Sequence, residues 1–219
     1  MAPATLKTSI ICVSTVCGRI SPACMGSPLD RQRLEALRDA TGASLIGAAT
    51  LRRDDPVMAA GGGRLPANRI RAVITGSGRI SPDGKALFSG RGPLPVVFSS
   101  AVAAPKLQRL LTTTAEVVAV AGTPAGELDL KEILAWLADR DVDRLLIEGG
   151  GRLNYSALAQ GVVDEIHLTL APRLLGAGSG ISLLEGPAPL GDPFLDLELT
   201  GCEQVATGEL FLTYTVAKE

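Results

Sequence analysis

The chain has little histidine and no metal-binding pattern of cysteines. Among 219 residues it contains one histidine, His167, and four cysteines, Cys12, Cys17, Cys24 and Cys202. No two cysteines stand in a C-x-x-C pair, so the sequence offers no structural zinc motif. A single histidine also argues against multi-histidine metal sites and against histidine-dependent catalytic triads. We therefore expect a protein without a bound metal.

Long apolar runs and a surplus of charge of one sign are also absent. No apolar run approaches the ~20 residues of a membrane-spanning helix, and the first residues lack the apolar core of a secretion signal. The formal net charge is −2, from 21 Lys and Arg against 23 Asp and Glu, with no basic tract of the kind that binds nucleic acid. We expect a cytoplasmic protein whose partner is a small molecule rather than a membrane or a nucleic acid.

What the chain does have is a regular alternation of strand-like and helix-like segments. Hydrophobic residues make up 46% of it and charged residues 20%, which is typical of a globular chain with a substantial core. Strands are expected at 6–16, 43–48, 70–75, 95–99, 115–121, 144–147, 165–171, 195–202 and 209–216. Helices are expected at 30–40, 106–111, 130–138 and 153–160.

This order of segments predicts an α/β fold. Alternating strands and helices build a largely parallel sheet with helices on both faces. The last two strands have no helix between them, which indicates an antiparallel pair. No segment has the composition of an interdomain linker, so residues 1–219 are expected to form one domain with a mixed, mostly parallel central sheet.

Three consecutive glycines, Gly149, Gly150 and Gly151, follow the strand at 144–147 and precede a helix. Without Cβ atoms, the backbone can approach a ligand closely and adopt unusual torsions. The first amides of a helix have no intrahelical partner, so together with the helix dipole they attract anions such as phosphate. The cluster predicts a phosphate cradle at the carboxyl edge of the sheet. A tight turn without a ligand is the alternative, because neither G-x-x-x-x-G-K-[ST] nor G-x-G-x-x-G matches.

Several short motifs, spread along nearly the whole chain, form one recognisable pattern. They are STVCGRI at 14–20, GAATLRRDDP at 47–56, EGGGRLN at 148–154, GVVDE at 161–165 and APRLLG at 171–176. With these motifs the chain resembles the pyrimidine reductases of riboflavin biosynthesis, including the C-terminal domain of the bifunctional deaminase-reductases; 47–56 looks like their G-x-x-T-x-x-x-D-x-P. The resemblance implies a three-layer, dihydrofolate reductase-like fold with eight or nine strands, and a homodimer.

The resemblance also implies NADPH as the cofactor. The cofactor-binding residues that it implies are Thr50, Ser77, Arg79, Gly149, Gly150, Gly151, Arg152 and Leu153. Backbone amides of the glycine segment would hold the diphosphate. Ser77 and Arg79 would meet the 2′-phosphate, for which a guanidinium is well suited; a solvated loop arginine is the alternative. In the resembled fold the paired glycines commonly share a cis peptide, so ω near 0° is expected between Gly149 and Gly150.

Two acids, Asp54 and Glu148, are the candidate catalytic and substrate-binding residues. An acid in a cleft can accept hydrogen bonds from the amino groups of a pyrimidine, although Asp54 could instead be a turn acid before Pro56. Glu148 follows an apolar strand, where burial is costly without a partner or a raised pKa. Cys17 stands where the family usually has an aspartate, and is the third candidate substrate residue.

Three functions follow from this pattern. The first is an NADPH-dependent reductase that delivers hydride to a ribosylaminopyrimidine phosphate. The second keeps the fold and the cofactor but uses another heterocyclic substrate. The third is a non-catalytic nucleotide-binding protein. Cys17 favours the last two, as does the sequence at 59–61, where the family often has a basic residue.

Overall fold

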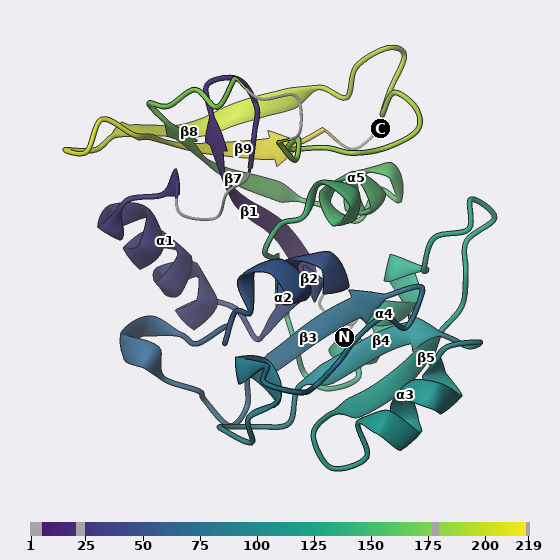
Figure 1. The fold of residues 1–219 in the computed structure, drawn as a ribbon. Coiled ribbons are helices and arrows are strands. Elements are labelled where there is room, and N and C mark those ends of the chain that lie inside the picture. Colours follow the sequence, from purple (N-terminus) through teal and green to yellow (C-terminus); the bar gives the residue numbers. More distant parts are fainter. Residues whose placement is uncertain (1–5, 21–24, 177–179, 218–219) are drawn as a thin grey trace.

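The computed structural model describes residues 6–20, 25–176 and 180–217. Nine strands of this described part form one sheet in the order β5-β4-β3-β2-β6-β1-β7-β9-β8 (Figure 1). The strands are β1 (Lys7–Thr15), β2 (Ala43–Gly47), β3 (Ile70–Thr75), β4 (Val96–Ser100), β5 (Glu116–Val120), β6 (Arg144–Ile147), β7 (Glu165–Ala171), β8 (Leu197–Gln204) and β9 (Leu210–Val216). The helices are α1 (Pro28–Asp39), α2 (Ala48–Asp54), α3 (Ala104–Leu110), α4 (Leu130–Ala138) and α5 (Gly151–Ala159), with short 3-10 turns at Gly61–Gly63 and Ala86–Phe88.

The strand directions confirm the expected mixed, mostly parallel sheet. All pairs from β5 to β7 are parallel, whereas β9 pairs antiparallel with both β7 and β8. The carboxyl ends of β2, β6 and β1 therefore lie side by side in the middle of the sheet, where ligands of open α/β sheets bind. That all 219 residues form a single domain stays a prediction.

Helices cover both faces of the sheet, as expected. One core contains side chains of α2 and α3 and includes Val73 and Val97. The other contains side chains of α4 and α5 and includes Leu45 and Phe98. Helix α4 follows from its sequence: Asp129 accepts a hydrogen bond from Lys131 N, and the apolar stripe is buried, as an N-cap and a helical period require.

Two elements differ from the expected pattern. Helix α2 was not expected, because it has seven residues, begins directly after β2 at Gly47 and has no side-chain cap, so the usual start signal of a helix is missing. Strand β8 lies two residues further along the chain than expected. It is an edge strand exposed on both faces, so no buried face imposes an alternating pattern on its sequence.

Helix α1 is fixed at its start and along its length. Ser27 caps it by accepting hydrogen bonds from Leu29 N and Asp30 N. Farther along, Arg33 donates to Leu168 O on β7 at 3.2 Å and to Leu212 O on β9 at 2.9 Å. These bonds tie α1 to the parallel and antiparallel parts of the sheet at once. No helix within the described residues is long and apolar enough to cross a membrane.

Candidate active site

A cleft of about 510 Å³ opens at the carboxyl ends of the central strands, between α1 and α2. Its floor is formed by β1, β2 and the end of β6; one wall is α1, and the other is α2 with the segment that follows it. The structure brings five of the predicted site residues into this lining together: Thr50, Asp54, Glu148, Gly149 and Gly150. No group of three or more potential metal ligands was found among the described residues.

The paired glycines use left-handed torsions rather than a cis peptide. The φ angles are 80° at Gly149 and 102° at Gly150, and the cis peptide of the described chain is Asp192–Pro193. The expected cis bond between Gly149 and Gly150 is therefore wrong. Two consecutive positive φ values turn the chain at this point without cis geometry, and they favour glycine because a Cβ would be strained there. A Cβ on Gly150 would also lie 3.2 Å from Thr50 Oγ1.

The first turn of α5 leaves amide groups free. Within the described part of the chain, the N–H groups of Gly151, Arg152 and Leu153 have no hydrogen-bond acceptor, as expected at a helix start. Arg152 is exposed, and the side chain of Leu153 is buried in the core. These two residues can therefore contribute backbone amides at this edge.

The third glycine has an additional, structural explanation. A Cβ on Gly151 would lie 2.5 Å from Ser182 O and 2.7 Å from Glu185 Cγ, and Glu185 N donates to Gly151 O at 3.0 Å. The segment at 182–185 therefore packs directly on the start of α5. The missing Cβ of Gly151 makes room for the protein's own chain, and only its N–H stays available to an anion.

Glu148 lies in the cleft floor and already has protein partners. Arg38 Nε donates to Glu148 Oε1 at 2.8 Å and Arg38 Nη2 to Oε2 at 2.5 Å, while Ser44 Oγ donates to Oε1. The side chains of Arg38 and Glu148 are 2% and 7% exposed. The buried carboxylate of Glu148 is thus compensated by the charge of Arg38, as a buried acid requires.

Three buried arginines hold the opposite wall of the cleft. Arg38, Arg69 and Arg71 donate to three consecutive carbonyls, those of Ala59, Met58 and Val57, at 2.8, 3.3 and 3.2 Å. Burial lowers the pKa of Arg69 to about 10, well above neutral pH, so the side chain remains a charged donor.

The wall that these arginines hold has an unusual backbone. Asp55 and Met58 have φ values of 44° and 55°, a region that costs energy for residues other than glycine and persists where the surroundings enforce it. Asp55 also accepts hydrogen bonds from Ala86 N at 3.0 and 3.1 Å. Such enforced backbone is typical of ligand sites.

Asp54 and three predicted residues outside the cleft lining occupy three different positions. Asp54 lies in the cleft, where both of its oxygens accept hydrogen bonds from Arg53 at 2.7 and 2.6 Å. Ser77 and Arg79 are exposed in the loop after β3, outside the cleft lining but at the same edge of the sheet. Cys17 is also outside the lining. Hydrogen bonds from Thr15, the larger effect, and from the backbone of Leu175 lower the pKa of Cys17 to about 7.

Comparison with known proteins assigns the family. A family model described as the RibD C-terminal domain matches residues 17–211. The chain belongs to this family. It is 34% identical over 182 residues to the 2,5-diamino-6-ribosylamino-4(3H)-pyrimidinone 5′-phosphate reductase of Methanothermobacter thermautotrophicus, covering 78% of this chain and 80% of that protein. It is 27% identical over 148 residues to the riboflavin biosynthesis protein RibD of Actinobacillus pleuropneumoniae, covering 67% of this chain but 38% of that longer protein.

Solved structures agree with the RibD C-terminal domain assignment. Acinetobacter baumannii RibD, form 1, matches all of this chain and 60% of its own chain, with a TM-score of 0.79 at 20% identity. The riboflavin biosynthesis reductase Rib7 of Saccharomyces cerevisiae matches with a TM-score of 0.77 at 15% identity, over 99% of this chain and 92% of its own. These structures confirm the dihydrofolate reductase-like fold, and the family match confirms the resemblance to the riboflavin reductases.

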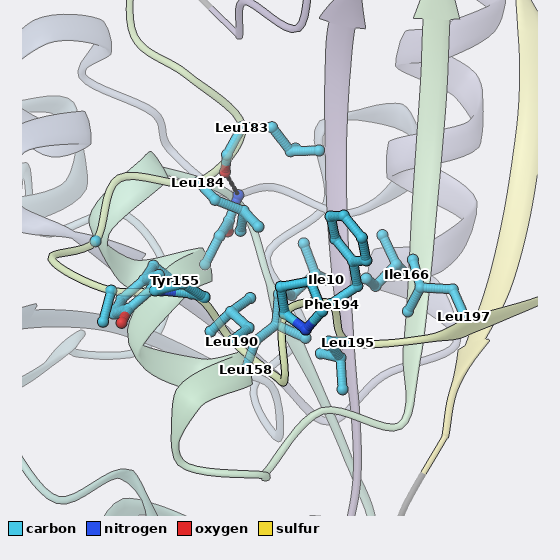
Figure 2. Close-up of a pocket in the computed structure, with 15 residues that line it drawn as sticks. Ile10, Tyr155, Leu158, Ile166, Leu183, Leu184, Leu190, Phe194, Leu195 and Leu197 are labelled. Carbon is cyan, nitrogen blue, oxygen red and sulfur yellow. Dashed lines mark hydrogen bonds between the residues drawn. The ribbon is translucent and has the colours of Figure 1, made fainter.

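This RibD C-terminal domain has another cavity, of about 390 Å³. Its lining is mostly apolar, unlike the more polar lining of the cleft at the glycines. Figure 2 shows apolar side chains of β1, β7, α5 and the segment at 183–195 around it, including Ile10, Leu158, Ile166 and Leu190. Phe194 and Leu197 lie at this cavity and are 80% and 42% exposed. With an apolar lining of this kind, the cavity offers packing surface rather than chemistry.

The sequence analysis missed several residues of the cleft. Asp30 and Arg31 of α1 line it, as do Arg38 and Met58. The signal for Asp30 was present, because an acid in the first turn of the helix after β1 lies near the edge where β1 ends. No sequence signal marks Met58 as left-handed or pairs Arg38 with Glu148, since these partners are 110 residues apart.

Proposed function

We propose that this chain is an NADPH-dependent reductase of a ribosylaminopyrimidine phosphate, the class of compound that the named archaeal relative reduces. The observation that carries the proposal is that the glycine pair, beside the free amides of α5, opens into the same cleft as Asp30, Asp54 and Glu148. A cofactor held at this edge would meet a polar heterocycle held between α1 and α2. The reductase class itself is supported by the family.

The cofactor would be held mainly by backbone. The amides of Gly149, Gly150, Gly151, Arg152 and Leu153 would bind its diphosphate, because a helix start with free N–H groups attracts anions. Thr50 lies against Gly150 and would face the same group. When bound, NADPH supplies the hydride.

At the exposed loop after β3, Ser77 and Arg79 would take the 2′-phosphate. A planar guanidinium can bind two phosphate oxygens at once.

The substrate would be oriented by polar groups of the cleft. Asp54 is proposed as an acceptor for substrate N–H groups. Glu148 has about four lone-pair sites, of which Arg38 and Ser44 occupy three, so its carboxylate would accept one further bond. Cys17 is proposed as the third substrate contact, although it lies outside the lining of the cleft and its Sγ accepts a hydrogen bond from Leu175 N.

Two other functions fit the same fold. Cys17 and the sequence at 59–61 depart from the family pattern at expected substrate positions, which favours another heterocyclic substrate or a non-catalytic nucleotide-binding role. The decisive experiment is NADPH oxidation with the ribosylaminopyrimidine phosphate. Turnover would establish the first function. NADPH binding without turnover on this or related heterocycles would establish the third.

We further propose that the chain forms a homodimer through β8 and the apolar cavity. Strand β8 is the edge of the sheet and is exposed on both faces; unpaired edges of this length are normally covered. Leu199 on β8 is 53% exposed, and Phe194, which lies at the cavity, is 80% exposed. A second copy would cover both. The cytoplasmic location and the preference for NADPH over NADH stay predictions from the sequence.

A further inference from the structure

The acids of the cleft differ in what their carboxylates already bind. Glu148 is held by Arg38 and Ser44. Asp54 is held by Arg53, and Asp55 caps the backbone at Ala86. Asp30 also lines the cleft, and among the described residues no cation lies within ion-pair distance of it. Among the described residues Asp55 also has no ion pair, but its two oxygens already bind the Ala86 amide, which leaves Asp30 as the cleft acid with neither an ion pair nor a backbone amide.

The local structure explains why Asp30 does not bind the backbone amide at the start of α1. An acid three residues after a serine N-cap normally accepts a hydrogen bond from the backbone N–H of that cap. Here Ser27 N donates instead to Glu209 Oε1 at 2.8 Å, and Ser27 Oγ bonds to Glu209 Oε2. Glu209 therefore replaces Asp30 at the start of α1. Gly26 leaves room for the displaced carboxyl, since a Cβ there would overlap Asp30 Oδ2.

The surroundings of Asp30 favour its protonated form. Burial raises its pKa above the ordinary range, and the charge of Glu209 acts in the same direction, while Thr169 on β7 and the arginines Arg33 and Arg31 lower it by less. Cys12 on β1 faces the same carboxyl. A raised pKa brings a carboxylic acid toward the range in which it can donate a proton near neutral pH.

We propose that Asp30 is the proton donor of the reduction, an assignment that rests on the proposed function. Hydride from the dihydronicotinamide would form the new C–H bond at the carbon of the substrate C=N group. The π-electron pair of that bond moves to nitrogen, which takes the proton of the Asp30 carboxyl. The product is a secondary amine, the cofactor is oxidised by two electrons, and the Asp30 carboxylate regains its proton from water.

The test compares Asp30→Asn with a carboxylate on the same helix. Asp39→Asn is the control, because Asp39 pairs with Arg64 on the surface and does not line the cleft. With the ribosylaminopyrimidine phosphate, D30N should lose about 100-fold or more in kcat, within the range for general acids, while D39N keeps wild-type kcat.

The pH profile is a separate readout. The wild-type rate should fall as pH rises through the Asp30 pKa, and D30N should lack this decline. NADPH affinity, measured by fluorescence, should be the same in all three proteins.

A second measurement needs no turnover. Infrared spectra of the wild-type protein with 13C-labelled aspartate should retain a protonated carboxyl band at pH values above the ordinary aspartate range, at which exposed aspartates have lost theirs, and D30N should lack this band. Full activity of D30N, or no such band in the wild type, would overturn the role of Asp30 alone. A wild-type chain that turns over no pyrimidine substrate would overturn the proposed function, and the proton transfer with it.

Discussion

Arg38 and Glu148 form a buried, two-point ion pair that joins α1 to the end of β6, with N–O distances of 2.8 and 2.5 Å. Removing one partner leaves the other charge buried without compensation, which costs about 3–5 kcal/mol. Glu148→Gln should therefore lower the free energy of unfolding by about this amount in urea titrations. Glu116→Gln, at the exposed Arg140 pair of 3.7 Å, should change it by less than about 1 kcal/mol. Equal small effects of both would show that the buried pair is dispensable.

Gly150→Ala tests the phosphate cradle. The variant should weaken NADPH binding at least tenfold, because its Cβ would crowd Thr50 Oγ1 and strain a residue with φ of 102°. Gly161→Ala is a matched control: φ is also positive, at 66°, but no atom lies within 4 Å of the new Cβ. It should share the strain of roughly 1–2 kcal/mol and leave NADPH affinity unchanged. Wild-type affinity in a folded G150A protein would count against the cradle.

Arg69→Met tests the support of the cleft wall. Arg69 donates to Met58 O, Arg38 O and Ser44 Oγ, so its loss removes several buried hydrogen bonds at about 1–3 kcal/mol each for the groups left unpaired. We expect faster amide hydrogen exchange at 57–60 and a higher KM for the pyrimidine substrate, with NADPH affinity unaffected. Unchanged exchange at these residues would show that the left-handed segment holds its shape without Arg69.

Cys17 should be unusually reactive toward alkylating reagents. The thiolate is the nucleophile, and a pKa of about 7 makes half of the thiol ionised near neutral pH. In a background with Cys24 and Cys202 replaced by serine, the iodoacetamide rate should therefore rise with pH to a midpoint of about 7. Thr15→Val removes the main stabilising hydrogen bond and should move the midpoint up, toward about 8.5. An identical midpoint in both proteins would contradict this assignment.

Leu199→Glu should disrupt the proposed dimer. A charge on β8 would be placed in the apolar contact between two copies, so sedimentation at micromolar concentration should show a monomer. Val102→Glu provides the control, because Val102 is 92% exposed but lies in the turn between β4 and α3, away from β8. A wild-type protein that sediments as a monomer would refute the dimer, and a dimeric L199E would place the interface elsewhere.

The sequence by itself determined the architecture. Apolar runs of strand length, separated by helical stripes such as that of α4, carry their information locally, so β3, α4, β6 and β7 have the expected bounds. The run of three glycines likewise located the ligand edge, because a strand-to-helix junction without Cβ atoms has a local physical meaning. Helix α2 was missed because it is short and has no side-chain cap, and the bounds of β8 were shifted because this edge strand has no buried face to mark it.

Only the tertiary structure decided which acids of the cleft are free. Glu148 was placed in the cleft from its position after β6, but its partner Arg38 comes from a helix 110 residues away, and no local pattern specifies such a pair. The same holds for Glu209, which is 182 residues from Ser27, accepts the hydrogen bond of its amide and so leaves Asp30 without that bond. The torsions at Gly149 and Gly150 were also settled by packing. Periodicity fixes which face a residue occupies, whereas the charge state of a buried group depends on whatever the fold brings within a few ångströms of it.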